Sequence, residues 1–275
     1  MRDYFHGKII LITGASSGIG EELATQLARS GALLTLAARR TQRLREVAAR
    51  LVAAGAPEPL TLECDVTCDG DVERAVSETI RVRGRLDIAI ANAGFGVVGA
   101  FTELALADYR RQFETNVFGL LRTLQAALPQ VLANKGHLVL IGSVAGWVAT
   151  PLTSPYAMSK FTVRALANSI TPELAPAGVK VTLVSPGFIE SDIRRVDNQG
   201  TLHREAREPI PAWLIMRRDK AVRQILRAVE HGRREIILTA HGKLFVALER
   251  FAPWILRAAG RRMAARGRGY RGEAR

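Results

Sequence analysis

A tyrosine and a lysine stand four residues apart in the sequence, at Tyr156 and Lys160. This spacing places both side chains on one face of a helix predicted over residues 156–174. A phenol ionises near pH ~10, and a neighbouring ammonium favours the phenolate and lowers that pKa. Such a phenol can protonate a developing alkoxide or take a proton from an alcohol. Because the same pair also arises by chance on protein surfaces, its meaning depends on the elements around it.

A glycine-rich segment at residues 13–20 separates the first predicted strand from the first predicted helix. Gly14 permits a sharp turn, Gly18 lets the backbone approach a pyrophosphate, and Gly20 allows the helix to pack closely on the strand. The free N–H groups and the dipole at the start of the helix attract phosphates. In this strand–turn–helix context the segment predicts a dinucleotide site, and a tight turn without a ligand is the alternative.

The second predicted strand is followed directly by two arginines, Arg39 and Arg40, with no acidic residue beside them. An NAD site usually carries an Asp or Glu here, which accepts a hydrogen bond from the 2′-hydroxyl of the adenosine ribose. A guanidinium group instead suits a phosphate. The sequence therefore predicts NADP(H) rather than NAD(H), with Arg39 on the 2′-phosphate. The alternative is that both arginines are solvated at the start of the next helix.

Short apolar segments alternate with segments of helical periodicity along the chain. The apolar segments do not alternate with polar residues, which is typical of a parallel sheet covered on both faces. The pattern predicts a doubly wound α/β fold with right-handed crossovers. The predicted strands are residues 8–13, 33–38, 60–64, 86–91, 137–141, 179–184 and 235–238. The predicted helices are residues 21–29, 41–53, 71–82, 108–132, 156–174 and 217–231.

Further motifs follow the glycine-rich segment in a fixed order, and Ser143 precedes Tyr156 by thirteen residues. With these motifs the sequence resembles a short-chain dehydrogenase/reductase of the single-domain type over residues 8–239. The resemblance implies a Rossmann fold whose seven-stranded parallel sheet has the order 3-2-1-4-5-6-7, with helices on both faces. The motifs are residues 13–20, Asp65-Val66, Asn92-Ala93-Gly94, Asn116, Ser143, Tyr156 with Lys160, and Pro186-Gly187.

The same resemblance implies a role for each residue of a catalytic set. Tyr156 is the general acid/base, and Lys160 lowers its pKa and binds the nicotinamide ribose. Ser143 orients and polarises the substrate carbonyl, and Asn116 supports a water that connects Lys160 to solvent. No metal is expected, because the histidines are dispersed along the chain.

The resemblance also implies a set of cofactor-binding residues. Ser191 stands where the family usually has Thr, and it keeps the hydroxyl for the carboxamide. Ser17 stands where some NADP-preferring members carry a basic residue, so the NADP(H) preference depends mainly on Arg39. The implied cofactor-binding residues are Gly14, Ser16, Ser17, Gly18, Ile19, Gly20, Arg39, Asp65, Val66, Asn92, Ala93, Gly94, Tyr156, Lys160, Pro186, Gly187, Ile189 and Ser191.

Composition sets the broad class of the protein. The chain has 275 residues, 48% of them hydrophobic, with a net charge of +13 and only two cysteines. It lacks an apolar run long enough for a transmembrane helix and begins without a recognisable signal peptide. Sparse cysteine fits a reducing compartment, and we expect a cytoplasmic protein. The predicted organisation is an oxidoreductase domain over residues 1–242, including a lid at residues 190–216 around Pro209 and Pro211, and a C-terminal extension over residues 243–275.

Apolar residues are concentrated where the substrate is expected to bind. Residues of the lid and of the loops facing it predict a hydrophobic carbonyl or alcohol substrate, or else only the packing of the lid. They are Phe95, Val97, Val98, Trp147, Ile189, Ile193, Ile210, Trp213, Leu214 and Met216.

The C-terminal extension has an apolar stripe beside arginines, with a kink expected at Pro253. It predicts contact with an anionic membrane surface, or packing over the active-site mouth or a dimer surface, and no nucleic-acid binding.

The predicted function is thus an NADP(H)-dependent oxidoreductase that moves a hydride between nicotinamide and a carbonyl or secondary alcohol carbon. The alternative is a cofactor-binding scaffold or sensor without turnover. The intact set of Asn116, Ser143, Tyr156 and Lys160 favours the enzyme. By resemblance, a homodimer or homotetramer that pairs through the helices at residues 108–132 and 156–174 is expected.

Overall fold

The computed structural model describes residues 2–198, 201, 203, 205, 208 and 210–267 of the chain. Seven strands form one sheet in which all pairs are parallel, in the order β3-β2-β1-β4-β5-β6-β7. The predicted sheet and its strand order are therefore confirmed. The strands are β1 (Ile9–Thr13), β2 (Leu33–Ala38), β3 (Leu60–Glu63), β4 (Ile88–Ala91), β5 (His137–Ile141), β6 (Lys180–Ser185) and β7 (Glu235–Ile237).

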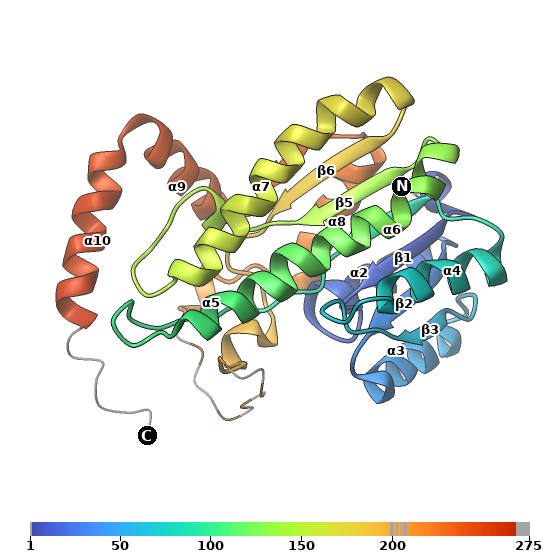
Figure 1. The fold of residues 1–275 in the computed structure, drawn as a ribbon, viewed down its shortest axis with the longest axis horizontal. Coiled ribbons are helices and arrows are strands. Elements are labelled where there is room, and N and C mark those ends of the chain that lie inside the picture. The colour runs from blue at the N-terminus through green and yellow to red at the C-terminus, as the bar shows by residue number, and fades with distance from the viewer. Residues whose placement is uncertain are drawn as a thin grey trace.

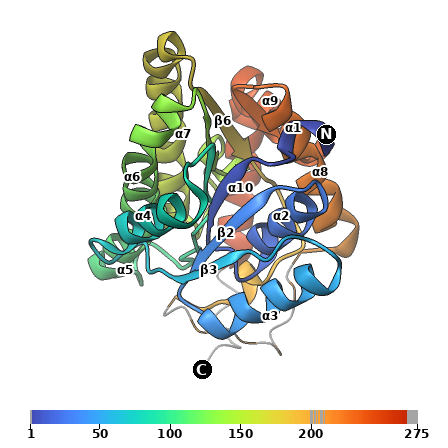
Figure 2. The same ribbon diagram turned by 90° about the vertical axis from the view of Figure 1, so that its right-hand side faces the viewer.

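Helices cover both faces of the sheet, which explains why its strands are apolar on both sides. Figure 2 shows α4, α6 and α7 on one side and α2, α3 and α8 on the other. Two separate cores of buried side chains fill these layers. The layer helices are α2 (Gly18–Arg29), α3 (Thr41–Ala53), α4 (Asp71–Arg83), α5 (Leu106–Phe113), α6 (Gly119–Ala133), α7 (Ser154–Leu174) and α8 (Arg218–Glu230).

The helix predicted over residues 108–132 is not regular along its length. It consists of α5, a π-helical turn η1 (Glu114–Phe118) and α6, joined without a break in helical backbone angles. Asn116 lies in the π turn and is buried. A π turn inserts one residue into the helical register, so it re-aims the side chains that it carries. The turn therefore sits where the sequence places a functional asparagine.

The chain continues beyond β7 as two further helices, α9 (Ala240–Phe251) and α10 (Pro253–Gly267). They separate at Ala252, as the kink expected at Pro253 requires. Figure 1 shows both helices together at one end of the molecule, with α10 standing out from the body. The division predicted after residue 242 stays a prediction, and it falls inside α9. Pro209 and the arginines of residues 268–275 lie outside the described residues.

A short helix α1 (Arg2–Phe5), which the sequence did not predict, precedes β1. Phe5 is fully buried in the core shared by α2, α3 and α8. Within the part of the chain that the structure describes, no helix combines the length and apolar character needed to cross a membrane.

Candidate active site

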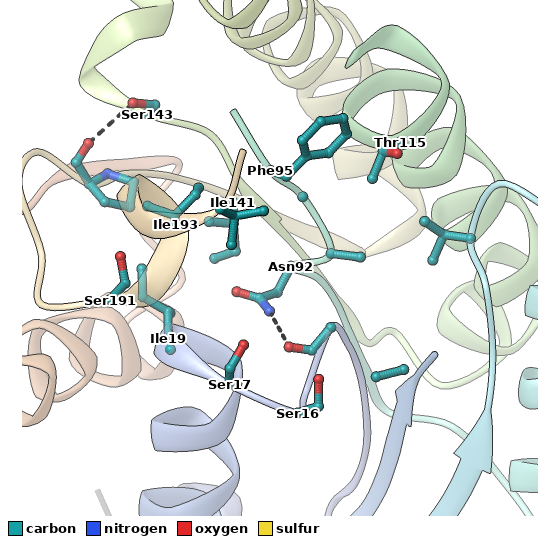
Figure 3. A pocket seen from close by; sticks show the side chains of 18 of the residues that line it. Ser16, Ser17, Ile19, Asn92, Phe95, Thr115, Ile141, Ser143, Ser191 and Ile193 are labelled. Atoms are coloured by element: carbon teal, nitrogen blue, oxygen red, sulfur yellow. Dashed lines mark hydrogen bonds between the residues drawn. The ribbon is translucent and has the colours of Figure 1, made fainter. Parts of the chain in front are cut away.

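A cavity of about 460 Å³ opens at the carboxyl ends of the central strands. It lies where β1 pairs with both β2 and β4, so the strand order reverses there, and open parallel sheets bind ligands at such points. Figure 3 shows Ser16, Ser17 and Ile19 along one side of it and Ser143 with Phe95 on the other. The predicted residues that line it are Gly14, Ser16, Ser17, Gly18, Ile19, Arg39, Asp65, Val66, Asn92, Ala93, Gly94, Ser143, Tyr156, Lys160, Pro186, Gly187, Ile189 and Ser191.

The glycine-rich turn requires its glycines. Gly14 has a φ of +68°, and a Cβ there would lie 2.8 Å from the Cα of Ala93. Asn92 holds the turn, because its Nδ2 donates to the carbonyl oxygens of Thr13 at 3.0 Å and Gly14 at 3.1 Å (Figure 3). Gly20 lies outside the cavity lining, where its missing side chain lets α2 pack against the turn. The result is a rigid backbone cradle of the kind that accepts a pyrophosphate.

Two arginines flank this cradle after β2, and they differ in how they are held. Arg40 donates to the hydroxyls of Ser16, at 3.1 Å from Nη2, and Ser17, at 2.7 Å. The side chain of Arg39 is 68% exposed, and its Nη1 lies 3.8 Å from a carboxylate oxygen of Asp65. Both line the cavity. Arg39 was predicted as the main phosphate ligand, whereas Arg40 has the hydrogen bonds to the glycine-rich turn.

Lys160 is buried, with 6% of its surface exposed. Its Nζ donates to the carbonyl oxygen of Ile141 at 2.9 Å and lies 5.8 Å from the ring centroid of Tyr156. Burial disfavours the ammonium and lowers the pKa of Lys160 to about 8. The helix that carries both residues, α7, begins at Ser154 with Pro155 next, where the missing N–H of proline costs nothing.

The phenol of Tyr156 faces the same cavity, and its pKa is raised by burial. A hydrogen bond with Ser143 and the positive charge of Arg194 act in the opposite direction and lower that pKa. The net direction of the shift is therefore opposite to the lowered pKa predicted from the Tyr156–Lys160 spacing. The reason is that burial penalises the phenolate more than these neighbours stabilise it.

Ser143 lies two residues beyond β5, where it begins a 3₁₀ turn, η2 (Val144–Gly146). Its Oγ accepts a hydrogen bond from the backbone N–H of Ala145 at 3.0 Å and lies 3.5 Å from the carbonyl oxygen of Pro186 (Figure 3). These contacts fix the hydroxyl at the carboxyl edge of the sheet. The hydroxyl is thereby placed to hydrogen-bond an oxygen atom of a molecule bound in the cavity beside Tyr156.

Asn116 lies behind the cavity and is not among the described residues that line it. Its Nδ2 donates to the carbonyl oxygen of Phe95 at 3.0 Å and to Ser159 Oγ at 3.2 Å, and its Oδ1 accepts from the N–H of Phe95 at 3.1 Å. A Cβ on Gly94 would lie 3.0 Å from Asn116 Oδ1 and 3.8 Å from Lys160 Nζ. Asn116 therefore braces the loop after β4 beside the lysine, and its role in a water relay stays a prediction.

Several residues expected at the substrate mouth lie elsewhere. The indole of Trp147 stacks on the guanidinium of Arg164, 3.3 Å from the ring centroid, and donates to Ser185. Trp213 is 81% exposed, and Val97 is buried in the protein. Of the apolar residues expected at the mouth, Phe95, Ile189 and Ile193 line the cavity.

The structure adds lining residues that were not predicted, and two charged ones, Arg111 and Arg194, come from distant segments of the chain. The reciprocal hydrogen bonds between Val98 and Asn198 help to explain this arrangement. The backbone N–H of Val98 donates to Asn198 Oδ1 at 3.0 Å, and Asn198 Nδ2 donates to the Val98 carbonyl at 2.8 Å. They close the lid over the loop after β4. The added residues include Arg40, Thr67, Arg111, Thr115, Arg194 and Val196.

Comparison with known proteins identifies the family of the chain. A sequence model of the family described as short chain dehydrogenase matches residues 8–201. The chain belongs to the short-chain dehydrogenase family. Its enzyme class is therefore that of a dehydrogenase acting on CH–OH groups, and NAD(P) is the cofactor typical of this family.

Curated relatives of this short-chain dehydrogenase include plant proteins. 11-beta-hydroxysteroid dehydrogenase A of Sesamum indicum is 33% identical over 261 residues, which are 91% of this chain and 75% of the relative. 11-beta-hydroxysteroid dehydrogenase 1A of Arabidopsis thaliana is 39% identical over 189 residues, 68% of this chain and 54% of the relative. The chain thus spans about half to three quarters of the length of these relatives.

Solved structures share the fold of this short-chain dehydrogenase over most of its length. An alcohol dehydrogenase from the archaeon Thermococcus sibiricus, complexed with 5-hydroxy-NADP, has a TM-score of 0.74 and 26% identity, covering 86% of this chain and 97% of that one. A short-chain dehydrogenase/reductase from Burkholderia phymatum, in complex with NAD, has a TM-score of 0.81 and 26% identity, covering 92% and 96%. One neighbour thus carries an NADP derivative and the other NAD.

Proposed function

We propose that this protein is an NADP(H)-dependent oxidoreductase that transfers a hydride between nicotinamide and a carbonyl or secondary alcohol carbon of a hydrophobic substrate. The proposal is carried by one observation: Tyr156, Lys160 and Ser143 line the same cavity as the glycine-rich cradle. A phenol, an ammonium and a hydroxyl in that arrangement suit proton transfer to and from a substrate oxygen.

The cavity fits a dinucleotide at its glycine-rich end. A side chain at Gly14 would collide with Ala93, so bare backbone is kept where a pyrophosphate would lie. Arg39 and Arg40 would hold the 2′-phosphate at the end of β2, and Lys160 would reach the nicotinamide ribose. When bound, the cofactor supplies or accepts the hydride.

The protein's own residues supply the proton. In the reducing direction, Tyr156 donates its proton to the carbonyl oxygen while Ser143 hydrogen-bonds the same oxygen. In the oxidising direction, the phenolate of Tyr156 takes the proton of the alcohol. Because burial raises the pKa of Tyr156, the phenol keeps its proton at neutral pH, which suits reduction. Positive charge near the phenol is then required for the reverse reaction.

The choice of NADP(H) is tested by removing the two arginines separately. Arg39→Ala and Arg40→Ala are each expected to weaken NADPH binding at least about 10-fold while changing NADH binding little, because only NADPH carries the 2′-phosphate. Arg43→Ala is the matched control, since Arg43 lies on α3, the helix that directly follows the two arginines, and pairs with Glu46. Dissociation constants for both cofactors would come from nucleotide fluorescence. An equal loss for NADPH and NADH would remove the assignment of the 2′-phosphate.

We further propose a steroid-like or similarly lipophilic ketone or alcohol as the substrate. Phe95, Ile189, Ile193 and Val196 provide the apolar part of the lining beside Tyr156. The names of the plant relatives point in the same direction. A panel of ketosteroids, aromatic ketones and short polar ketones at saturating NADPH would test this. The highest kcat/KM is expected for the lipophilic members, and a preference for short polar ketones would contradict the proposal.

We also propose that the protein works in the cytoplasm as a homodimer or homotetramer and contacts anionic membrane surfaces through its C-terminal helices. Supporting this, Phe251 is 73% and Trp254 64% exposed, and Arg250 and Arg257 lie on the same two helices. Apolar residues beside arginines suit an anionic bilayer surface. Flotation of the full chain with vesicles containing phosphatidylglycerol is expected, and Trp254→Ser should reduce it. Equal flotation of Trp254→Ser and wild type would contradict this contact.

The proposed homodimer or homotetramer is tested separately by sedimentation equilibrium, which is expected to give a mass of two or four chains.

A further inference from the structure

The cavity in front of Tyr156 contains a cation that belongs to neither the catalytic set nor the cradle. Arg194 lies in the lid, on the 3₁₀ turn η4 (Asp192–Arg195), and lines the cavity together with Tyr156 and Ser143. Only 18% of its side chain is exposed. A charged side chain so far from water requires fixed partners.

Three hydrogen bonds fix the guanidinium of Arg194. Its Nε donates to Glu208 Oε1 at 2.6 Å, and its Nη2 donates to Glu208 Oε2 at 2.9 Å and to the carbonyl oxygen of Ile189 at 3.1 Å. The Oε1 of Glu208 also accepts from the backbone N–H of Ile210 at 3.2 Å. The arginine hydrogen bond lowers the pKa of Glu208, so this carboxylate is ionised at neutral pH. The two sides of the lid are joined by a charged, bidentate pair.

We propose that Arg194 is a positioning residue for the reaction, which fixes a positive charge on the lid side of the cavity that Tyr156 and Ser143 line, and that Glu208 holds this charge in place and offsets part of it. The proposal rests on the assignment of Tyr156 as the general acid/base. It adds a charge pair in the lid to the catalytic set, and it gives the closed lid an electrostatic role besides covering the cavity.

The charges around Tyr156 explain why a second cation matters. Lys160, on the same helix, has a pKa lowered to about 8 by burial, so it loses its charge in mildly alkaline solution. A guanidinium stays protonated throughout that range. The positive charge of Arg194 lowers the pKa of Tyr156, opposing the rise caused by burial. Arg194 therefore supports the phenolate at a pH where Lys160 no longer does.

The other groups that contact Tyr156 or line the cavity leave this role to Arg194. Ser143, beyond β5, is a neutral hydrogen-bonding partner, and on the loop after β4 Gly96 presents backbone, where a Cβ would lie 3.5 Å from the ring of Tyr156. Arg111, on α5, lines the cavity but is 40% exposed and pairs with Asp108 at 3.0 Å. Asp65, after β3, also lines the cavity, beside Arg39.

The test uses two variants that break the same ion pair and remove charges of opposite sign. The measured quantity is the midpoint of the pH profile of kcat/KM for alcohol oxidation, which reports the ionisation of the free enzyme's general base. Arg194→Gln removes a positive charge and is expected to raise the midpoint by about half a pH unit or more. Glu208→Gln removes the opposing negative charge and is expected to lower the midpoint. Arg194→Lys keeps the charge and is expected to restore the wild-type midpoint within about 0.3 units.

A purely structural latch gives a different outcome. If the pair only holds the lid, Arg194→Gln and Glu208→Gln raise KM together and leave the midpoint unchanged, which would overturn the proposal. Arg217→Gln is the matched control, because Arg217 is also near the lid but 81% exposed and paired with Asp219. Its midpoint is expected to equal that of wild type. A wild-type profile that survives in Tyr156→Phe would instead refute the role of Tyr156, so the two failures are distinguishable.

Discussion

The two edges of the parallel sheet both bury a basic side chain, and they use it differently. At the carboxyl edge, burial lowers the pKa of Lys160 to about 8. At the amino edge, burial lowers the pKa of His137 to about 3. Lys160 faces a cavity of about 460 Å³ and donates to one carbonyl oxygen. The imidazole of His137 instead lies on β5 beside a smaller cavity of about 150 Å³, with 1% of its surface exposed.

The hydrogen bonds of His137 show that its site is structural. The hydroxyl of Thr182 donates to the carbonyl oxygen of Arg233 at 2.6 Å, so its oxygen accepts from Nε2 of His137 at 2.8 Å. This order places the proton of the neutral ring on Nε2. Its Nδ1 is buried and has no hydrogen-bond partner among the described residues. The lowered pKa of His137 thus belongs to a side chain held by a hydrogen bond within the sheet, whereas that of Lys160 belongs to a side chain that lines the larger cavity with Tyr156. A lowered pKa alone does not separate these two cases, and the surrounding geometry does.

The largest difference between the two edges is expected from alanine substitutions of two glycines, Gly20 at the carboxyl edge and Gly136 at the amino edge. Both substitutions should lower the stability, and only the first should weaken cofactor binding. A Cβ on Gly20 would collide with the carbonyl oxygen of Gly14 and lie 2.6 Å from Asn92 Nδ2, while a Cβ on Gly136 would collide with the carbonyl oxygen of Asp87. Both alanine variants are expected to lose about 1–3 kcal/mol of unfolding free energy through overpacking. Gly20→Ala alone should weaken NADPH binding, by at least about 10-fold, because it displaces the cradle.

Urea unfolding and nucleotide titration of the two variants provide these values. Gly55→Ala is a control for the cost of an added methyl group, since nothing lies within 4 Å of that position, although its φ of +81° adds backbone strain. Weakened NADPH binding in a folded Gly136→Ala variant would show that the two edges are coupled.

Lowering the pH is expected to have a smaller effect, a loss of unfolding free energy caused by His137 at the amino edge. The pKa of His137 is lower in the folded protein than its ordinary value of 6.5, so the unfolded chain binds more protons between pH 6.5 and about 3. Stability is therefore complete above pH 6.5 and falls as the pH drops through this window. From pH 7 to pH 5 the loss from this one group is about 2 kcal/mol.

The contribution of His137 is measured as a difference between variants. His137→Gln should be less sensitive to that pH change than wild type by about the same 2 kcal/mol in urea unfolding. His231→Gln, at an exposed position, should behave like wild type. Equal pH sensitivity of His137→Gln and wild type would remove His137 from the explanation of acid sensitivity.

The sequence predicts the strands and helices well where one periodicity holds throughout. The bounds of β2, α3 and β5 agree with the predicted residues 33–38, 41–53 and 137–141. The predicted helix at residues 108–132 shows the limit, because a π turn keeps the helical pattern and shifts the register by a residue. Asn116, in this turn, hydrogen-bonds the distant Phe95, and local periodicity does not encode such contacts.

The candidate site also contains residues that the sequence predicts and residues that depend on contacts between distant segments. The cradle residues are predictable because they follow one another between a strand and a helix, and the catalytic set has fixed spacing. Arg194 was missed because its place beside Tyr156 depends on how the lid folds back, through contacts such as that of Asn198 with Val98, one hundred residues apart. A signal was available for Arg40, which follows Arg39 directly, yet its hydrogen bonds to Ser16 and Ser17 are a property of the folded turn.

The central claim is that Tyr156 transfers the proton that accompanies hydride transfer, and one measurement tests it directly. For Tyr156→Phe, kcat with NADPH and a lipophilic ketone is expected to fall by about 10²- to 10⁴-fold, with NADPH affinity within about 3-fold of wild type. Tyr109→Phe is the matched control, because the hydroxyl of Tyr109 bonds only Ser154 among the described contacts, at 2.6 Å, and its kcat should be unchanged. Wild-type turnover by Tyr156→Phe would show that another group supplies the proton and would contradict the account.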